Sequence, residues 1–357
     1  MSASGDADVA AVRAGEELPV AALAAWFAEA APELAGQPVE VLQFPKGHSN
    51  LTYLLRVGER ELVLRRPPHG AKIASAHDMA REHTILSALN PRLPQAPRPL
   101  AFCGDEGVLG APFYVMERVR GLIVRKTLPA AWAGDAARAR AVSEVTCDAL
   151  VMLHAVDWRA AGLGELWKGE GYVARQVSGW AGRYSRARTD DVPTIEAAAA
   201  WLAAHLPEEQ APALIHNDVK PDNLVLDVDD PRRVVGILDW EMATIGDPLM
   251  DLGTTLGYWV QADDPAPAQA FAFCPSNAPG ALTRAEMVAR YEQRSGRVVG
   301  DPVFYYVYGL FKLAVVAQQI YQRYATGKTK DKRFASFIFG VRVLGDMAAR
   351  AIEAGRL

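Results

Sequence analysis

Cysteine is scarce in this chain: Cys103, Cys147 and Cys274 are the three present among 357 residues. They lie far apart and are odd in number, so they match neither the close spacing of a zinc site nor a disulfide framework. Scattered cysteines of this kind are typical of a reducing compartment. We therefore expect a cytoplasmic protein.

An excess of positive charge is also lacking. The chain carries 38 Lys and Arg against 42 Asp and Glu, which gives a formal net charge of −4. Proteins that bind nucleic acid or anionic membranes usually show a basic surplus, so we expect neither partner. The length of 357 residues is sufficient for two lobes with separate hydrophobic cores.

Targeting and membrane-spanning segments are not evident either. The first ten residues, MSASGDADVA, are small and acidic, and they lack the positive region and apolar core of a signal peptide. The longest apolar stretch, residues 303–317, contains Lys312 and is short for a membrane span. We expect this stretch to be a buried helix.

Glycine is sparse in a loop near the N-terminus. The pattern predicts strands at residues 39–44, 51–57 and 61–65. The first two are joined by a polar loop in which Gly47 is the one glycine. The backbone N–H groups of such a loop can hold phosphates, although an ordinary hairpin loop would look the same. The residues concerned are Lys46, Gly47, His48, Ser49 and Asn50.

The most informative stretch is residues 214–247, which contains two short apolar runs, 224–226 and 234–238, separated by a turn. Asp218 and Asn223 precede the first run, and Asp239 ends the second. A hairpin would bring Asn223 and Asp239 together, with Asp218 nearby. Two hard oxygen ligands suit Mg²⁺, and the remaining carboxylate can accept a hydroxyl proton.

Residues 216–223, His-Asn-Asp-Val-Lys-Pro-Asp-Asn, resemble a kinase catalytic loop, with Asn five positions after the Asp. Residues 237–241, Ile-Leu-Asp-Trp-Glu, resemble the metal-binding segment of the aminoglycoside phosphotransferase and choline kinase branch. Further segments resemble the kinase-like region fused to some acyl-CoA dehydrogenases and its free-standing bacterial relatives. They are residues 48–53, 64–68, 110–117 and 309–314.

The resemblance implies an α+β, protein kinase-like fold with two lobes. Residues 1–117 would form an N-lobe built on an antiparallel sheet, and residues 118–357 a mainly helical C-lobe. It also implies use of ATP and Mg²⁺. Asp218 would orient the acceptor hydroxyl, Lys220 would offset charge on the moving phosphoryl group, and Asn223 and Asp239 would bind the metal.

For the nucleotide, the resemblance implies that Arg65 occupies the position of the usual phosphate-binding Lys, although Lys46 and Lys72 are alternatives. Glu82 would pair with this cation. The adenine would meet the backbone of residues 117–119, with Met116 at the back of its pocket. The adenine-binding set is therefore Met116, Glu117 and Val119.

Helical periodicity predicts several further elements. Ser75 should begin a helix with Asp78 as its capping-box partner. Asp247 and Asp251 resemble a family signature in which such residues fix the metal loop and a following helix. We favour a structural role, in which they cap a helix and pair with an Arg, and we expect His154 to be a packed helix residue. The pattern predicts a loop at residues 261–282, and helices at residues 19–30, 131–157, 195–206, 282–296, 303–325 and 334–354, with one more helix that contains Val177, Trp180 and Tyr184.

The leading hypothesis is transfer of the γ-phosphoryl group of ATP to a hydroxyl of a small molecule, with a hydroxy acid or hydroxyacyl compound suggested by the fusion partner of the related proteins. Alternatives are a nucleotide-binding regulator with weak or no catalysis, motivated by Arg65, and a metal-dependent hydrolase. An aminoglycoside kinase is not supported, because the C-terminal stretch is not acidic. A choline-like kinase would need an aromatic cage, for which Tyr305, Tyr306 and Tyr308 are candidates, although packing is their expected role.

Overall fold

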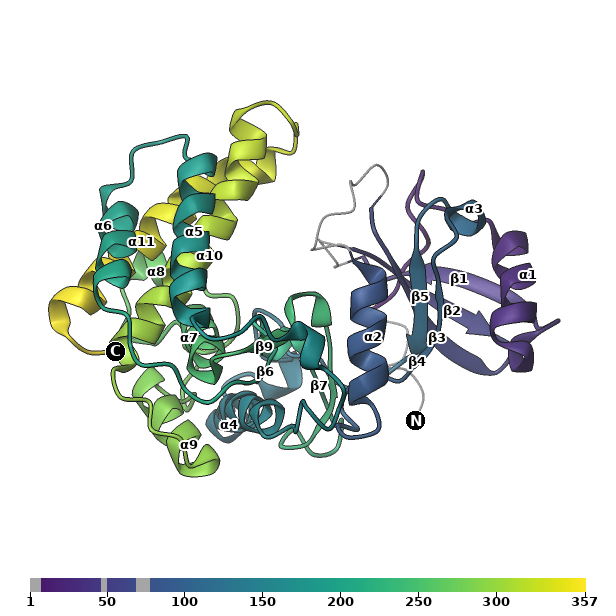
Figure 1. Cartoon of the computed structure of the whole chain (residues 1–357), viewed down its shortest axis with the longest axis horizontal. Coiled ribbons are helices and arrows are strands. Elements are labelled where there is room, and N and C mark those ends of the chain that lie inside the picture. The colour runs from purple at the N-terminus through teal and green to yellow at the C-terminus, as the bar shows by residue number, and fades with distance from the viewer. Residues whose placement is uncertain (1–7, 46–49, 69–77) are drawn as a thin grey trace. The chain divides into compact units, whose positions relative to one another are not determined.

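The computed structural model describes residues 8–45, 50–68 and 78–357 of the chain (Figure 1). Two compact units are formed. The first consists of Met1–Gly121 and Val235–Met242, and the second of Leu122–Val234 and Ala243–Leu357. The boundary expected between residues 117 and 118 stays a prediction.

The first unit is built on a five-stranded antiparallel sheet with the strand order β1-β2-β3-β5-β4. The three strands predicted in this region are confirmed within one residue at each end. The strands are β1 (Val39–Gln43), β2 (Leu51–Val57), β3 (Arg60–Arg66), β4 (Pro99–Cys103) and β5 (Phe113–Glu117), and the helices are α1 (Val20–Ala30), α2 (Met79–Leu89) and α3 (Glu106–Leu109).

Helices α1 and α2 lie on opposite faces of this sheet (Figure 1). On one face, Leu62 and Leu64 of β3 join a buried cluster with Phe27 of α1. Successive strand residues point to opposite faces, so Arg65 points away from this cluster and toward α2. The alternation along β3 therefore places a cation on the face that α2 covers.

Helix α2 begins later than predicted. Its N-cap is Asp78, whose side chain accepts a hydrogen bond from the backbone N–H of Arg81. The expectation that Asp78 would be the third residue of a capping box is therefore wrong, because Asp78 itself satisfies the first N–H groups of the helix. Ser75, the expected start, lies outside the described residues.

The second unit is mainly helical, and two of its strands, β6 and β9, pair antiparallel. Its helices are α4 (Ala136–His154), α5 (Tyr172–Ala187), α6 (Pro193–Ala204), α7 (Pro248–Tyr258), α8 (Ala266–Ala270), α9 (Arg284–Ser295), α10 (Pro302–Ala325) and α11 (Phe337–Ala354). Its strands are β6 (Ala213–Ile215), β7 (Leu224–Leu226) and β9 (Thr244–Gly246). The two strands predicted around the turn at residues 227–233 are confirmed as β7 and β8 (Val234–Ile237), and the N–H of Asp227 donates to the carbonyl of Arg233 across that turn.

Three predicted boundaries need correction. Helix α4 starts at Ala136 and not at residue 131, because Gly134 has a positive φ of 76° and Asp135 caps the helix. The loop predicted at residues 261–282 contains the short helix α8. The last helix starts at Phe337, after a 3₁₀ turn at Lys332–Ser336.

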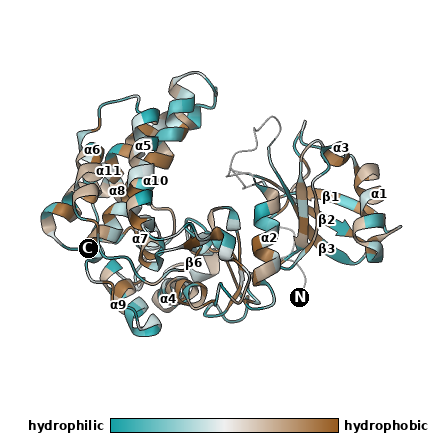
Figure 2. Ribbon diagram, viewed as in Figure 1, coloured by the Kyte–Doolittle hydropathy of each residue, from teal (hydrophilic) through white to brown (hydrophobic). Residues whose placement is uncertain are grey.

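By length and composition alone, helix α10 could cross a membrane. However, 78% of its most apolar 18 residues are buried inside the protein. The expectation of a buried helix is confirmed. Figure 2 colours much of α10 as hydrophobic, whereas α5 carries both polar and apolar residues. Helix α10 packs against α5, α7 and α11 and is thus the core helix of the second unit.

Glycines allow α7 and α10 to approach backbone to backbone. A Cβ at Gly309 of α10 would overlap the carbonyl oxygen of Gly253, and a Cβ at Gly257 would lie 2.6 Å from the carbonyl carbon of Gly309. Only glycine fits such a contact. The close approach matters because both helices carry side chains that hold the loop after β6.

Candidate functional site

The loop after β6 contains one of two unusual backbone conformations. Asn217 (φ 66°) and Asp239 (φ 67°) are the non-glycine residues with positive φ in the part of the chain that the structure describes. Asn and Asp tolerate this left-handed region better than other side chains. Such conformations concentrate at functional sites, and these two lie in the two segments that carry the predicted catalytic and metal-binding residues.

One face of α7 holds the loop at residues 216–219. Asp251 accepts hydrogen bonds from the backbone N–H groups of His216 and Asn217, both at 2.7 Å. Thr255, four residues later, donates its hydroxyl to the carbonyl of Val219 at 2.9 Å. Residues spaced by three or four share a helix face, so α7 binds the loop along its length.

The carboxylate of Asp251 also contacts a buried histidine. Nε2 of His154 lies 3.2 Å from Asp251, while its Nδ1 lies 2.7 Å from the hydroxyl of Tyr291. Burial raises the pKa of Asp251, but hydrogen bonds from His154 and the backbone of His216 outweigh burial and leave the pKa below its usual value. The lowered pKa favours the charged form of Asp251, which anchors the loop through its hydrogen bonds.

Lys312 of α10 reaches the same loop from the other side. Its Nζ donates to the carbonyl of Asn217 at 2.8 Å and lies 3.3 Å from the hydroxyl of Thr254. The residue is only 3% exposed. Burial lowers its pKa to about 8, against the opposing effect of the Asp218 and Asp251 carboxylates.

These anchors present the carboxylate of Asp218, whose side chain is 15% exposed. Its Oδ2 accepts from Nζ of Lys220 at 2.5 Å and from the amide of Asn223 at 2.8 Å. Its Oδ1 accepts from the hydroxyl of Tyr258, the last residue of α7, at 2.6 Å. The predicted residues Asp218, Lys220 and Asn223 are thus brought together in the second unit.

The first unit brings together a second group of predicted residues. Arg65 lies 3.5 Å from Glu82 of α2 and 3.0 Å from Asp239. Glu241, two residues after Asp239, lies 3.8 Å from Arg65 and accepts from the amide of Asn50 at 2.9 Å. Predicted residues Asn50, Arg65, Glu82 and Asp239 therefore form one connected network.

Arg65 and its acidic neighbours shift one another's pKa values. Glu82 is 2% exposed, and burial raises its pKa although Arg65 opposes that shift. Burial alone would lower the pKa of Arg65, but Glu82 and the other acidic neighbours raise it on balance. Arg65 thus remains a guanidinium cation held in a fixed direction.

Asp239 of the first unit and Asn223 of the second each offer an oxygen donor of the kind that Mg²⁺ binds. Asp239 offers a carboxylate that is 32% exposed. The amide nitrogen of Asn223 donates to Asp218, so its amide oxygen is the atom that can serve as a ligand. Hard oxygen donors of this kind, completed by water and phosphate oxygens, are what Mg²⁺ prefers.

The remaining predicted residues are placed as follows. Met116 and Glu117 end β5, Met116 being 7% exposed, and Val119 follows two residues later. Lys46, Gly47, His48 and Ser49, and the alternative Lys72, lie outside the described residues.

The interpretation of the two aspartates after the metal segment is half right. Asp247 caps α7 by accepting from the N–H of Leu249, as predicted. The expected pairing of Asp251 with an Arg is wrong, because its partners are His154 and the loop backbone. A helix interior position can reach a neighbouring loop, and local spacing does not reveal that loop.

Sequence reasoning missed Tyr258, Thr255 and Lys312 as parts of the site. The spacing of Asp251, Thr255 and Tyr258 on one helix face was a usable signal, since it follows directly on the capped start at Asp247. Lys312, a cation within an apolar helix, was another. A buried lysine needs a partner, and that requirement alone could have marked it.

Comparisons with known proteins show which family the chain resembles. Residues 40–283 match the family of aminoglycoside phosphotransferase type described as the phosphotransferase enzyme family. Acyl-CoA dehydrogenase family member 10 of Mus musculus is 33% identical over 297 residues, which cover 82% of this chain and 27% of that protein. Acyl-CoA dehydrogenase family member 11 of Homo sapiens is 32% identical over 350 residues, 94% of this chain and 43% of that protein. The chain therefore spans less than half the length of these curated relatives.

Solved structures show the same fold. A candidate aminoglycoside phosphotransferase from Ralstonia eutropha is 30% identical with a TM-score of 0.79, covering 95% of this chain and 99% of that chain. An aminoglycoside phosphotransferase in complex with AMP-PNP and hygromycin B is 17% identical with a TM-score of 0.59, over 92% of this chain and 98% of that one. Choline kinase from Cryptosporidium parvum is 13% identical, also with a TM-score of 0.59, over 94% and 99%.

The predicted fold class, an antiparallel-sheet unit and a helical unit of protein kinase-like type, is thereby confirmed. The match to the phosphotransferase enzyme family covers most of the chain, and the similarity to the Ralstonia eutropha protein covers nearly all of it. On these grounds the chain belongs to the aminoglycoside phosphotransferase-type family of phosphotransferase enzymes.

Proposed function

We propose that this phosphotransferase moves the γ-phosphoryl group of ATP to a hydroxyl group of a small molecule. The observation that carries the proposal is the carboxylate of Asp218, partly exposed and held on both oxygens by Lys220, Asn223 and Tyr258. A carboxylate fixed in this way can orient a hydroxyl and accept its proton as the reaction proceeds.

In this reaction the acceptor oxygen forms a bond to the γ-phosphorus while the bond to the β–γ bridging oxygen breaks. ADP leaves with that oxygen, and the hydroxyl proton passes to Asp218. Lys220, at 2.5 Å from Asp218, offsets negative charge near the moving group. The transition state is loose, so the protein acts mainly through positioning and electrostatics.

Asn223 and Asp239 are the proposed ligands of Mg²⁺, which when bound would neutralise charge on the phosphate oxygens. Arg65, oriented by Glu82, is the proposed cation for the nucleotide phosphates, together with the loop at residues 46–50. The backbone of residues 117–119, beside Met116, is the proposed contact for the adenine.

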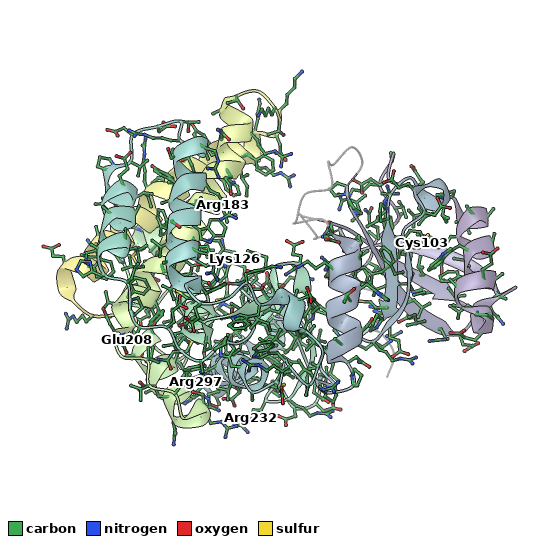
Figure 3. The ribbon with its side chains drawn as sticks, viewed as in Figure 1. Cys103, Lys126, Arg183, Glu208, Arg232 and Arg297 are labelled. Atoms are coloured by element: carbon green, nitrogen blue, oxygen red, sulfur yellow. The ribbon has the colours of Figure 1, made fainter. Side chains whose placement is uncertain are left out.

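Cationic side chains near Asp218 can attract an anionic acceptor, and the carboxylate of Asp222, 3.6 Å from Lys220, offsets part of their charge. Nζ of Lys220 donates to the carboxylate of Asp218, and Nζ of Lys312 donates to the carbonyl of the preceding residue, Asn217. The guanidinium of Arg183 on α5 (Figure 3) lies 4.6 Å from the ring centre of Trp180, and Nζ of Lys312 lies 5.8 Å from the same ring. These cations oppose the charge of a polycationic aminoglycoside and can pair with the carboxylate of a hydroxy acid.

A choline-type cation is not favoured either. An aromatic cage needs exposed rings, but Tyr305, Tyr306 and Tyr308 of α10 are 1%, 2% and 0% exposed. Their expected packing role is confirmed. We therefore propose a hydroxy acid or hydroxyacyl compound as the acceptor class.

The decisive experiment measures ADP formation from ATP–Mg²⁺ across a panel of hydroxyl compounds, with mass spectrometry of the products. We expect Asp218→Asn to lower the rate by about 10²–10⁴-fold. Asp229→Asn is the matched control, because Asp229 is an exposed aspartate of the turn before β8. Full transfer by Asp218→Asn would refute the assigned role.

A further inference from the structure

An exposed aromatic ring lies next to the side chain that binds Asp218. Phe273 is 40% exposed. Its ring packs edge-on against that of Tyr258, with centroids 5.3 Å apart and an interplanar angle of 81°. The hydroxyl of Tyr258 donates to Oδ1 of Asp218 at 2.6 Å. An apolar surface therefore begins one side chain away from the carboxylate assigned to the acceptor hydroxyl.

The fold holds this ring outward while it buries the residues on either side. Ala272 and Cys274 are 7% and 1% exposed. Two residues further on, the Ser276 hydroxyl accepts from the N–H of Val260 at 3.0 Å and donates to its carbonyl at 2.8 Å. These hydrogen bonds fix the backbone near Ser276 to Val260, two residues after the end of α7. Phe273 is therefore exposed from a segment whose position is fixed.

A second exposed aromatic residue, Phe339, lies near the same segment of chain. Phe271, two residues before Phe273, has its ring centroid 5.2 Å from that of Phe339 of α11, and Phe339 is 48% exposed. Single exposed apolar residues are ordinary. Here one exposed ring, Phe273, contacts the Asp218 partner Tyr258, and Phe271, two residues before it, contacts the exposed ring of Phe339. This grouping of rings next to the carboxylate points to a ligand.

We propose that Tyr258 and Phe273 form the subsite for an alkyl or acyl chain of the acceptor, with Tyr258 also acting as a positioning residue for Asp218. This inference rests on the proposed function. A carboxylate oxygen has two lone pairs, so Oδ1 can accept from Tyr258 and from the acceptor hydroxyl together. Nζ of Lys220 lies 5.2 Å from the centre of the Tyr258 ring, so we expect the carbons of a hydroxyl compound bound there to contact the edge of that ring and the exposed ring of Phe273.

The binding experiment uses decanoate and butyrate, which lack a hydroxyl and cannot react, in calorimetric titrations of the full chain. We expect decanoate to bind more tightly than butyrate, by up to about fourfold for each methylene that contacts the rings. Phe273→Ala should weaken decanoate binding by about tenfold and leave butyrate unchanged.

Trp167→Ala is the matched control. Trp167 is equally exposed, at 40%, but its ring packs against Trp158. Equal decanoate affinity in Phe273→Ala and the native protein would overturn the proposal, as would an equal loss in Trp167→Ala.

The positioning role of Tyr258 has a separate readout. Tyr258→Phe keeps the ring and its contact with Phe273 but loses the hydroxyl, so decanoate affinity should not change. With 3-hydroxydecanoate as acceptor, kcat should fall about tenfold, as for loss of a hydrogen bond to a charged group, while KM stays the same. A changed decanoate affinity with an unchanged kcat would contradict this role.

The proposed function and the proposed apolar subsite can be refuted separately. Decanoate binding that depends on Phe273, without phosphoryl transfer to any hydroxyl compound, would refute the proposed function and support the apolar subsite. Transfer that is lost in Asp218→Asn but insensitive to chain length and to Phe273→Ala would support the function and overturn the subsite.

Discussion

Asn217 and Asp239 adopt the same left-handed backbone conformation, one in each unit. At Asn217 the conformation turns both backbone groups to fixed partners: its N–H donates to Asp251 and its carbonyl accepts from Lys312. At Asp239 the conformation accompanies a side-chain contact with Arg65 at 3.0 Å. In both places the unusual φ sets the direction of groups that the proposed reaction needs.

The strain at Asn217 can be measured with two substitutions. Asn217→Gly and Asn217→Ala both lose the side chain, but only glycine adopts positive φ without steric cost. We expect Asn217→Ala to have a free energy of unfolding about 1 kcal/mol lower than Asn217→Gly. Urea denaturation of both variants tests this, and equal stabilities would show that the conformation is not strained.

Lys312 should make stability depend on pH in the alkaline range. Its pKa is lowered to about 8 in the folded protein, against about 10.4 in an unfolded chain. Between these values the unfolded state binds more protons, so the free energy of unfolding rises with pH. Relative to Lys312→Met, the native protein should gain up to about 1.4 kcal/mol per pH unit from pH 8 to 10.

The comparison with Lys312→Met cancels the other groups that titrate in this range. Denaturant unfolding of both proteins at pH 8 and pH 9.5 provides the measurement. A stability difference that stays constant between these pH values would contradict the assigned burial of the ammonium group.

At the scale of elements, α7 and α10 act together as the support of the loop after β6. Helix α7 supplies Asp251, Thr255 and Tyr258, and α10 supplies Lys312. The distance between these helices is set by glycine contacts, in which Gly309 meets Gly253 and Gly257. The spacing of two backbones therefore determines where the loop is held.

Gly309→Ala should disturb this support. The new methyl group would overlap the carbonyl oxygen of Gly253 and lie 3.1 Å from the backbone nitrogen of Gly257. We expect a loss of about 2–3 kcal/mol in unfolding free energy, typical of overpacking in a core, together with lower phosphoryl transfer. The stability loss is measured by denaturant unfolding.

Gly164→Ala is the control for that experiment, because a Cβ at Gly164 meets nothing within 4 Å. Its stability should change by no more than about 0.5 kcal/mol. If Gly309→Ala were as stable as Gly164→Ala, the backbone contact between the two helices would not be the constraint proposed.

At the scale of the whole molecule, the proposed reaction draws on both units. The network of Arg65, Glu82 and Asp239 belongs to the first unit, and the group of Asp218, Lys220 and Asn223 belongs to the second. The chain passes into the first unit at Val235 and leaves it after Met242. This short segment carries Asp239 into the first unit, whereas Asp218 and Asn223 stay in the second.

Ligand binding can separate these two groups. At about 100 times its Kd, ATP–Mg²⁺ should stabilise the protein by about 2.7 kcal/mol. We expect Asp218→Asn to keep this stabilisation, because Asp218 is assigned to the acceptor, and Asp239→Ala or removal of Mg²⁺ with EDTA to lose most of it. The midpoint of thermal unfolding with and without nucleotide is the measurement.

The stability of each variant without nucleotide serves as the control for folding. An unchanged ATP–Mg²⁺ effect in Asp239→Ala would refute its role as a metal ligand. Nucleotide stabilisation without transfer to any acceptor would instead favour the regulator hypothesis.

Much of the fold could be predicted from sequence because its signals are local. Strands β1, β2 and β3 are short runs rich in Val and Leu, and α10 is a long, mostly apolar stretch. The errors are at boundaries such as Asp78 and Gly134, where one capping or positive-φ residue decides the start of a helix. A periodic pattern extends past such residues and does not register them.

The sequence by itself determined which residues carry the proposed chemistry. The spacing from His216 to Asn223 and the segment around Asp239 are continuous motifs, which can be recognised without a structure. Only the tertiary structure decided what holds them. Tyr258 reaches Asp218 across 40 residues, and Lys312 reaches Asn217 across 95. Such bonds depend on how closely α7 and α10 pack, which is a property of the assembled core and not of any local stretch of chain.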